Sequence, residues 1–154
     1  MAMPMISQAD QDYIRTFFAE KLTGDVTIEL YTQPRSKIVL LGGGEECQYC
    51  EETQQLLEEV AALSERIELV VHDVKADPDA MQRGGVDQVP AIVFKGQARG
   101  TARFFGIPAG NEFRNLIDGI VEVGTGESGL AQPTRDALAA LEQDIHLRVF
   151  VTPT

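Results

Sequence analysis

Short apolar runs separated by amphipathic stretches constrain the fold more than any other feature of this sequence. Residues 37–41 and 67–71 are such runs, with the length of a β-strand and an excess of Ile, Val and Leu. Strands of this kind are typical of sheets whose faces are covered by helices. Between the two runs, residues 48–64 repeat apolar side chains with the period of a helix. The sequence therefore predicts an α/β fold.

The remaining segments extend the same pattern. Ser7 is a suitable N-cap for an amphipathic helix over residues 7–22. Further along, the pattern predicts strands over 26–32, 91–94 and 101–105, a short helix starting near 77–79, and a helix over 111–123. The last two strands follow each other closely enough to form a hairpin. This order predicts a mixed sheet with helices on both faces.

A glycine-rich stretch divides the chain. Residues 124–132 have the composition of a linker, and they follow a complete α/β unit over residues 1–123. The pattern then predicts a helix over 133–143 and a strand over 145–151. We interpret residues 133–154 as the opening of a second domain.

The two cysteines, Cys47 and Cys50, are separated by two residues. A secreted scaffold stapled by disulfides carries more cysteines, spread along the chain, so a close pair indicates redox chemistry or metal binding. The net charge of −11 argues against nucleic acid and anionic membranes as partners. No apolar stretch is long enough to span a bilayer, and residues 1–12 lack the features of a secretory signal. The expected location is cytoplasmic.

Disulfide exchange requires one thiolate that attacks and a second thiol that resolves the mixed disulfide. Cys47 is expected at the start of the helix, where the helix dipole and free N–H groups stabilise a thiolate. Cys50, expected one turn inside, suits the resolving role. Glu45 and Glu46 place negative charge beside Cys47 and raise its expected pKa, which favours a more reducing couple.

In these features the sequence resembles the thioredoxin and glutaredoxin superfamily. The motif Cys-Gln-Tyr-Cys at residues 47–50 follows a strand, and Val89 and Pro90 precede the next one. Residues 104–113 and 149–154 are closer still to the protein disulfide oxidoreductases, and the resemblance covers residues 7–154. That family has two thioredoxin-like units in tandem, each with a CxxC pair. The resemblance thus implies that residues 133–154 begin a truncated second thioredoxin-like unit.

The resemblance also implies how the site works. It implies a cis bond before Pro90, packed against the disulfide. It also implies that Val89 and Pro90 contact the substrate, with a main-chain edge at Val89 that pairs with an extended segment. Gln48 and Tyr49, between the cysteines, are expected to contact the substrate as well. The implied partners are protein disulfides and a flavoenzyme like thioredoxin reductase as electron donor. Neither a metal nor an organic cofactor is expected.

Three alternatives compete with this interpretation. A glutathione-dependent glutaredoxin has the same fold, although glutaredoxins often carry a basic residue where Glu46 stands. A non-catalytic docking module would use the cysteines structurally or for zinc. Zinc needs four ligands, and His72 and His146 are the only histidines available. Finally, the pair could be redox-inert, which the presence of both cysteines argues against.

Overall fold

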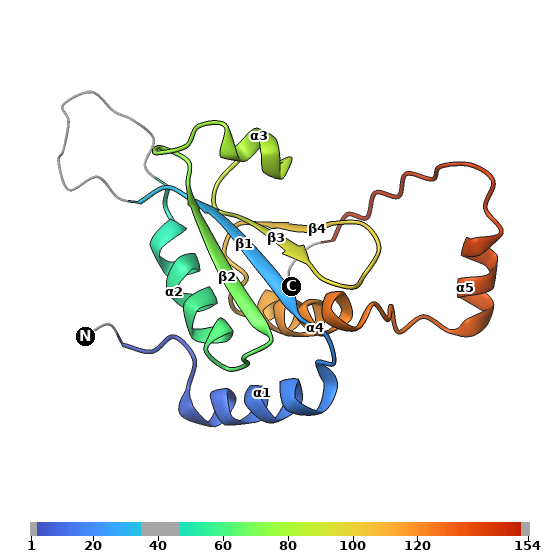
Figure 1. Cartoon of the computed structure of the whole chain (residues 1–154), viewed down its shortest axis with the longest axis horizontal. Helices are drawn as coiled ribbons and strands as arrows, with labels where there is room; N and C mark the ends of the chain where they lie inside the picture. Colours follow the sequence, from blue (N-terminus) through green and yellow to red (C-terminus); the bar gives the residue numbers. More distant parts are fainter. Residues whose placement is uncertain (1–2, 35–46, 152–154) are drawn as a thin grey trace.

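The protein is described by a computed structural model, which covers residues 3–34 and 47–151 (Figure 1). The elements, in chain order, are α1 (Gln8–Lys21), β1 (Val26–Thr32), α2 (Cys50–Ala61), β2 (Ile67–Asp73), α3 (Ala80–Gly84), β3 (Ala91–Lys95), β4 (Ala102–Phe105), α4 (Asn111–Thr125) and α5 (Gln132–Ala139). None of the described helices combines the length and apolar composition that crossing a bilayer requires.

The strands form a mixed sheet in the order β2-β1-β3-β4. β1 runs parallel to β2 and antiparallel to β3, and β3 and β4 are also antiparallel. The predicted α/β class and the hairpin of β3 and β4 are confirmed. The strand predicted at residues 37–41 lies outside the described residues. In the described sheet, β1 holds the position between the parallel and the antiparallel neighbour.

The strand predicted at 67–71 forms, but it does not show the deep burial that is typical of such an apolar run. β2 pairs with β1 alone within the described sheet and is therefore an edge strand. Glu68 is exposed on it and Val71 is 40% exposed. An apolar run specifies a strand locally, whereas the order of strands decides how deeply that strand is buried.

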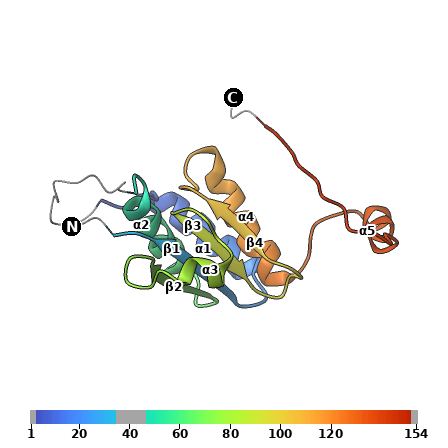
Figure 2. The same ribbon diagram turned by 90° about the horizontal axis from the view of Figure 1, so that it is seen from above.

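The core follows from the alternation of side chains along β1. Val26, Ile28 and Leu30 point to one face of the sheet, where α1, α2 and α4 supply further members of the main apolar cluster. Tyr31 belongs to a second, smaller cluster on the opposite face, with Ala80 of α3. The expectation of helices on both faces is confirmed, and the two views of the ribbon show this arrangement (Figures 1 and 2).

Local signals placed most helix ends within a few residues. Ser7 caps α1 as predicted, because its hydroxyl accepts a hydrogen bond from the Asp10 N–H at 3.2 Å. The helix predicted at 48–64 begins at Cys50 and ends at Ala61. The short helix expected near residues 77–79 begins at Ala80, after a turn in which the Asp77 N–H bonds to the Asp73 carbonyl.

The C-terminal part of the chain differs most from the expectation. α4 continues to Thr125 and ends at Gly126, which has a φ of 73°. α5 forms where a helix was predicted, but none of its residues is buried, and Figures 1 and 2 show it apart from the sheet. Residues 145–151 do not form the predicted strand. A strand needs a paired backbone, and residues 145–151 have no strand partner within the described sheet. The division at residues 124–132 stays a prediction.

Two glycines of α4 predict opposite effects on stability. A side chain at Gly124 would collide with Leu22 and come within 2.8 Å of Val26, while a side chain at Gly119 would meet nothing within 4 Å. We expect Gly124→Ala to lower the free energy of unfolding by about 1–3 kcal/mol through overpacking. We expect Gly119→Ala to raise it by roughly 0.5–1 kcal/mol through helix propensity. Urea unfolding of both variants measures the difference, and shifts of the same sign would contradict the packing described.

Candidate active site

The cysteine pair lies where the end of β1 meets the start of α2. Cys47 and Cys50 are joined by a disulfide with an S–S distance of 2.02 Å, and their Cα atoms are 5.6 Å apart. Two cysteines with this spacing at a helix start therefore lie within bonding distance of each other. Cys47 is in the turn that precedes α2, as expected. Cys50 is the first residue of the helix, not a residue one turn inside it.

The two sulfur-bearing residues differ in accessibility. Cys50 is 1% exposed, whereas Cys47 is only partly buried and Tyr49, between them, is 45% exposed. A reagent that approaches from solvent therefore meets Cys47 first.

Two residues at the site escaped the sequence analysis. The main-chain N–H of Gln33, directly after β1, donates a hydrogen bond to the Cys50 Sγ at 3.3 Å. The Thr53 hydroxyl donates to the Tyr49 carbonyl at 2.6 Å, which joins the CxxC turn to the first turn of α2. Thr53 is fully buried and occupies a position in the apolar stripe of α2. A threonine in an otherwise apolar stripe, three residues after the second cysteine, is the sequence feature that could have indicated this hydrogen bond.

The peptide bond between Val89 and Pro90 is cis, as the family resemblance implied. Pro90 directly precedes β3, and its carbonyl accepts a hydrogen bond from the Gly106 N–H at 2.9 Å. Ala91 pairs with Tyr31, two residues before Gln33. The register of β1 and β3 thus brings Pro90 to the same end of the sheet as the cysteine pair. Contact of Gln48, Tyr49, Val89 and Pro90 with a substrate stays a prediction.

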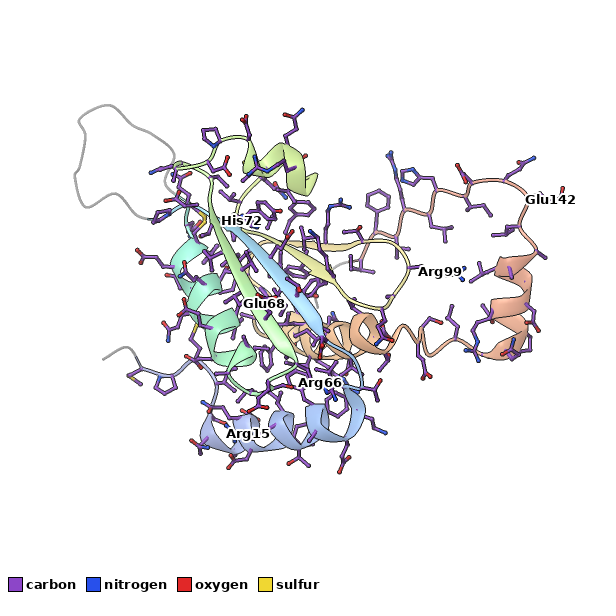
Figure 3. All side chains as sticks on the ribbon, in the orientation of Figure 1. Arg15, Arg66, Glu68, His72, Arg99 and Glu142 are labelled. Atoms are coloured by element: carbon purple, nitrogen blue, oxygen red, sulfur yellow. A yellow bond between two sulfur atoms is a disulfide. The ribbon has the colours of Figure 1, made fainter. Side chains whose placement is uncertain are left out.

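Neither histidine joins the cysteines. His72 stacks on Tyr31 with ring centroids 4.7 Å apart, and its Nε2 lies 3.9 Å from a Glu29 oxygen (Figure 3). That contact is on the sheet face opposite α2. His146 is exposed and accepts a hydrogen bond from Arg148. Among the described residues, no three His, Cys, Asp or Glu side chains gather as metal ligands.

A polar cluster surrounds Tyr31 on this second face. The Tyr31 hydroxyl donates to Glu29 at 3.0 Å, and Lys95 donates to the same carboxylate at 2.8 Å. Burial acts to raise the pKa of Glu29, but the hydrogen bonds from Lys95 and Tyr31 outweigh it, so that the pKa lies below its usual value. Burial, followed by the hydrogen bond to Glu29, raises the pKa of Tyr31 to about 12.

The pKa of Tyr31 has a measurable consequence at high pH. A folded-state pKa above the ordinary value of 10 favours the neutral phenol, so its contribution to stability is present below about pH 10 and is lost as the pH rises towards 12. We expect the difference between the phenolate absorbance titrations of the wild type and Tyr31→Phe to be centred near pH 12. A difference curve centred near pH 10 would contradict the hydrogen bond to Glu29.

These features define a class of protein. A mixed four-stranded sheet, a CxxC disulfide at the start of a helix and a cis-proline before the next antiparallel strand together make a thioredoxin fold with a cysteine pair of the redox type. The family model described as a thioredoxin domain matches residues 36–118, more than half of the chain. The chain belongs to this family.

Two solved structures show the same architecture. A protein disulfide oxidoreductase from Aeropyrum pernix is 27% identical, with a TM-score of 0.69 over 88% of this chain and 55% of its own. The alkylhydroperoxide reductase protein AhpF from Enterococcus faecalis is 23% identical, with a TM-score of 0.70 over 88% of this chain and 61% of its own; this second likeness concerns the fold. The chain thus spans less than two thirds of either relative. No curated protein matches the sequence.

Proposed function

We propose that this protein exchanges disulfides with protein substrates through Cys47 and Cys50, and so takes part in electron transport that serves cellular redox homeostasis. One observation carries the proposal: a partly exposed cysteine, Cys47, is bonded to a buried one, Cys50, at the start of a helix. A purely structural disulfide has no need of this asymmetry. The likeness to a protein disulfide oxidoreductase supports the same conclusion.

In the reduced protein, the Cys47 thiolate attacks one sulfur of a substrate disulfide. A bond forms between that sulfur and Cys47, and the other substrate sulfur leaves as a thiolate. The Cys50 thiolate then attacks the Cys47 sulfur, which releases the second substrate thiolate and restores the disulfide. The turn before α2 favours ionised Cys47, because the positive end of the helix dipole lies beside it.

The proposed substrate surface surrounds the Cys47 sulfur. Tyr49 is exposed and its hydroxyl accepts a hydrogen bond from the Gln48 amide at 3.1 Å, so the two side chains form one contact surface. The main chain at Val89 offers an edge to which an extended peptide can pair. Stacking on Tyr49 and pairing at Val89 both suit an unfolded or flexible protein segment better than a small thiol.

We also propose an electron donor and a cellular location for this protein. A flavoenzyme like thioredoxin reductase is the electron donor that the family resemblance implies. A cytoplasmic location suits the cysteine content, because a pair that reduces other proteins has to be returned to the dithiol, and the cytosol keeps thiols reduced.

The test is a single-turnover reaction between the reduced protein and insulin, with no other reductant present. We expect about one insulin disulfide to be reduced per molecule, because each molecule carries one dithiol. A second assay measures reduction of a glutathione mixed disulfide at the same protein concentration. Rapid turnover there with no insulin reduction would favour the glutaredoxin alternative and overturn the proposal. Inertness in both assays would favour the docking module.

A further inference from the structure

The end of β1 supplies a polar group to the buried sulfur of the site. The Gln33 N–H points at the Cys50 Sγ from 3.3 Å, although the two residues are 17 positions apart in the chain. β1 is held between β2 and β3, so the main chain next to Gln33 is anchored on both sides. Cys50 itself is 1% exposed and hence almost inaccessible to water.

We propose that the main-chain N–H of Gln33 is a catalytic group that stabilises negative charge on the Cys50 sulfur during disulfide exchange. This inference rests on the proposed function and adds a specific group to it. The hydrogen bond is already formed in the disulfide state. The donor is thus in place before charge develops, as catalytic hydrogen-bond donors generally are.

The chemistry of the step shows why such a group matters. When a thiolate attacks the accessible Cys47 sulfur, a new S–S bond forms there and the bond to Cys50 breaks. Both electrons of the broken bond go to the Cys50 sulfur, which leaves as a thiolate. A buried anion without water requires a protein donor, and the rate rises as the pKa of the leaving thiol falls.

The same group acts in the reverse direction. When Cys50 resolves a mixed disulfide on Cys47, its thiolate is the attacking species. The Gln33 N–H lowers the pKa of that thiol relative to a site without a donor, and therefore raises the fraction of thiolate available. One hydrogen bond thus accelerates both formation and opening of the disulfide.

The test compares two variants that share the loss of the Gln33 side chain and differ in the N–H. Gln33→Ala retains the main-chain donor and Gln33→Pro removes it, and residue 32 is already extended, as a residue before proline prefers. We expect dithiothreitol to open the disulfide about tenfold more slowly in Gln33→Pro than in Gln33→Ala, the scale of a hydrogen bond to a charged group. In a Cys47→Ser background, the pKa of the Cys50 thiol, followed by thiolate absorbance, should rise by about one unit between the same two variants.

An ester at residue 33, made with the hydroxy acid analogue of glutamine, keeps the side chain and removes only the N–H. It decides the question if Gln33→Pro does not fold. Equal opening rates for the ester protein and the wild type would overturn the proposal. Dithiothreitol needs no protein-binding surface, so its rate of disulfide opening is independent of the insulin assay. Suppose that the wild type fails to reduce insulin but the ester variant is opened by dithiothreitol more slowly than the wild type. The proposed substrate class is then rejected, and the role of the Gln33 N–H is retained.

Discussion

Cys47→Ser should reduce insulin no faster than buffer does, because serine cannot form the mixed disulfide that begins the exchange. Cys47 is the accessible member of the pair, so no other described thiol can take its place: Cys50 is 1% exposed. Turbidity from precipitated insulin chains measures the rate. The control is the fully reduced wild type. It lacks the disulfide just as the variant does, so a loss of stability from the missing disulfide affects both proteins equally.

Cys50→Ser should behave differently. Its Cys47 is still able to attack, but the mixed disulfide that forms has no resolving thiol. We expect a covalent adduct with an insulin chain, visible by mass spectrometry and released by dithiothreitol. An adduct on Cys47→Ser in place of Cys50→Ser would reverse the assigned roles.

Leu57→Ala should cause the largest loss of stability among simple truncations of α2. Leu57 is 0% exposed and lies in the main apolar cluster, between the sheet and the helix that carries the cysteines. Removal of a buried leucine side chain in this way costs about 3–5 kcal/mol, because a cavity remains. Urea unfolding of the disulfide form measures the change.

Leu138→Ala is the matched control. It is the same substitution on another helix, but Leu138 of α5 is 50% exposed and α5 has no buried residue. We expect a change within about 0.5 kcal/mol of the wild type. A loss as large as that of Leu57→Ala would show that α5 packs against a partner surface and would contradict its separation from the sheet.

Most of the site was predictable because its parts are local in the sequence. A spacing of three residues at a helix start brings two side chains within bonding distance wherever the helix lies. The alternation along 26–32 and the helical period of 8–21 likewise depend on neighbouring residues. The cis bond at Pro90 is a different case: residue patterns alone do not indicate it, and the prediction came from the family resemblance.

The two incorrect strand predictions share one cause. Residues 67–71 and 145–151 have similar apolar patterns, yet in the described sheet the first lies at an edge, and the second forms no strand. A strand is completed by hydrogen bonds to another part of the chain, and composition does not specify that partner. The burial of a predicted strand depends on the same distant partners.

The sequence by itself determined the cysteine pair, the helix that follows it and the order of the described elements from α1 to α5, because these depend on spacing and period over a few residues. The tertiary structure decided which sulfur is accessible and which main-chain group reaches the other. The Gln33 N–H meets Cys50 because β1 ends beside the start of α2. This contact depends on how β1 is placed by strands that are distant from it in the chain, and no local sequence pattern specifies that placement.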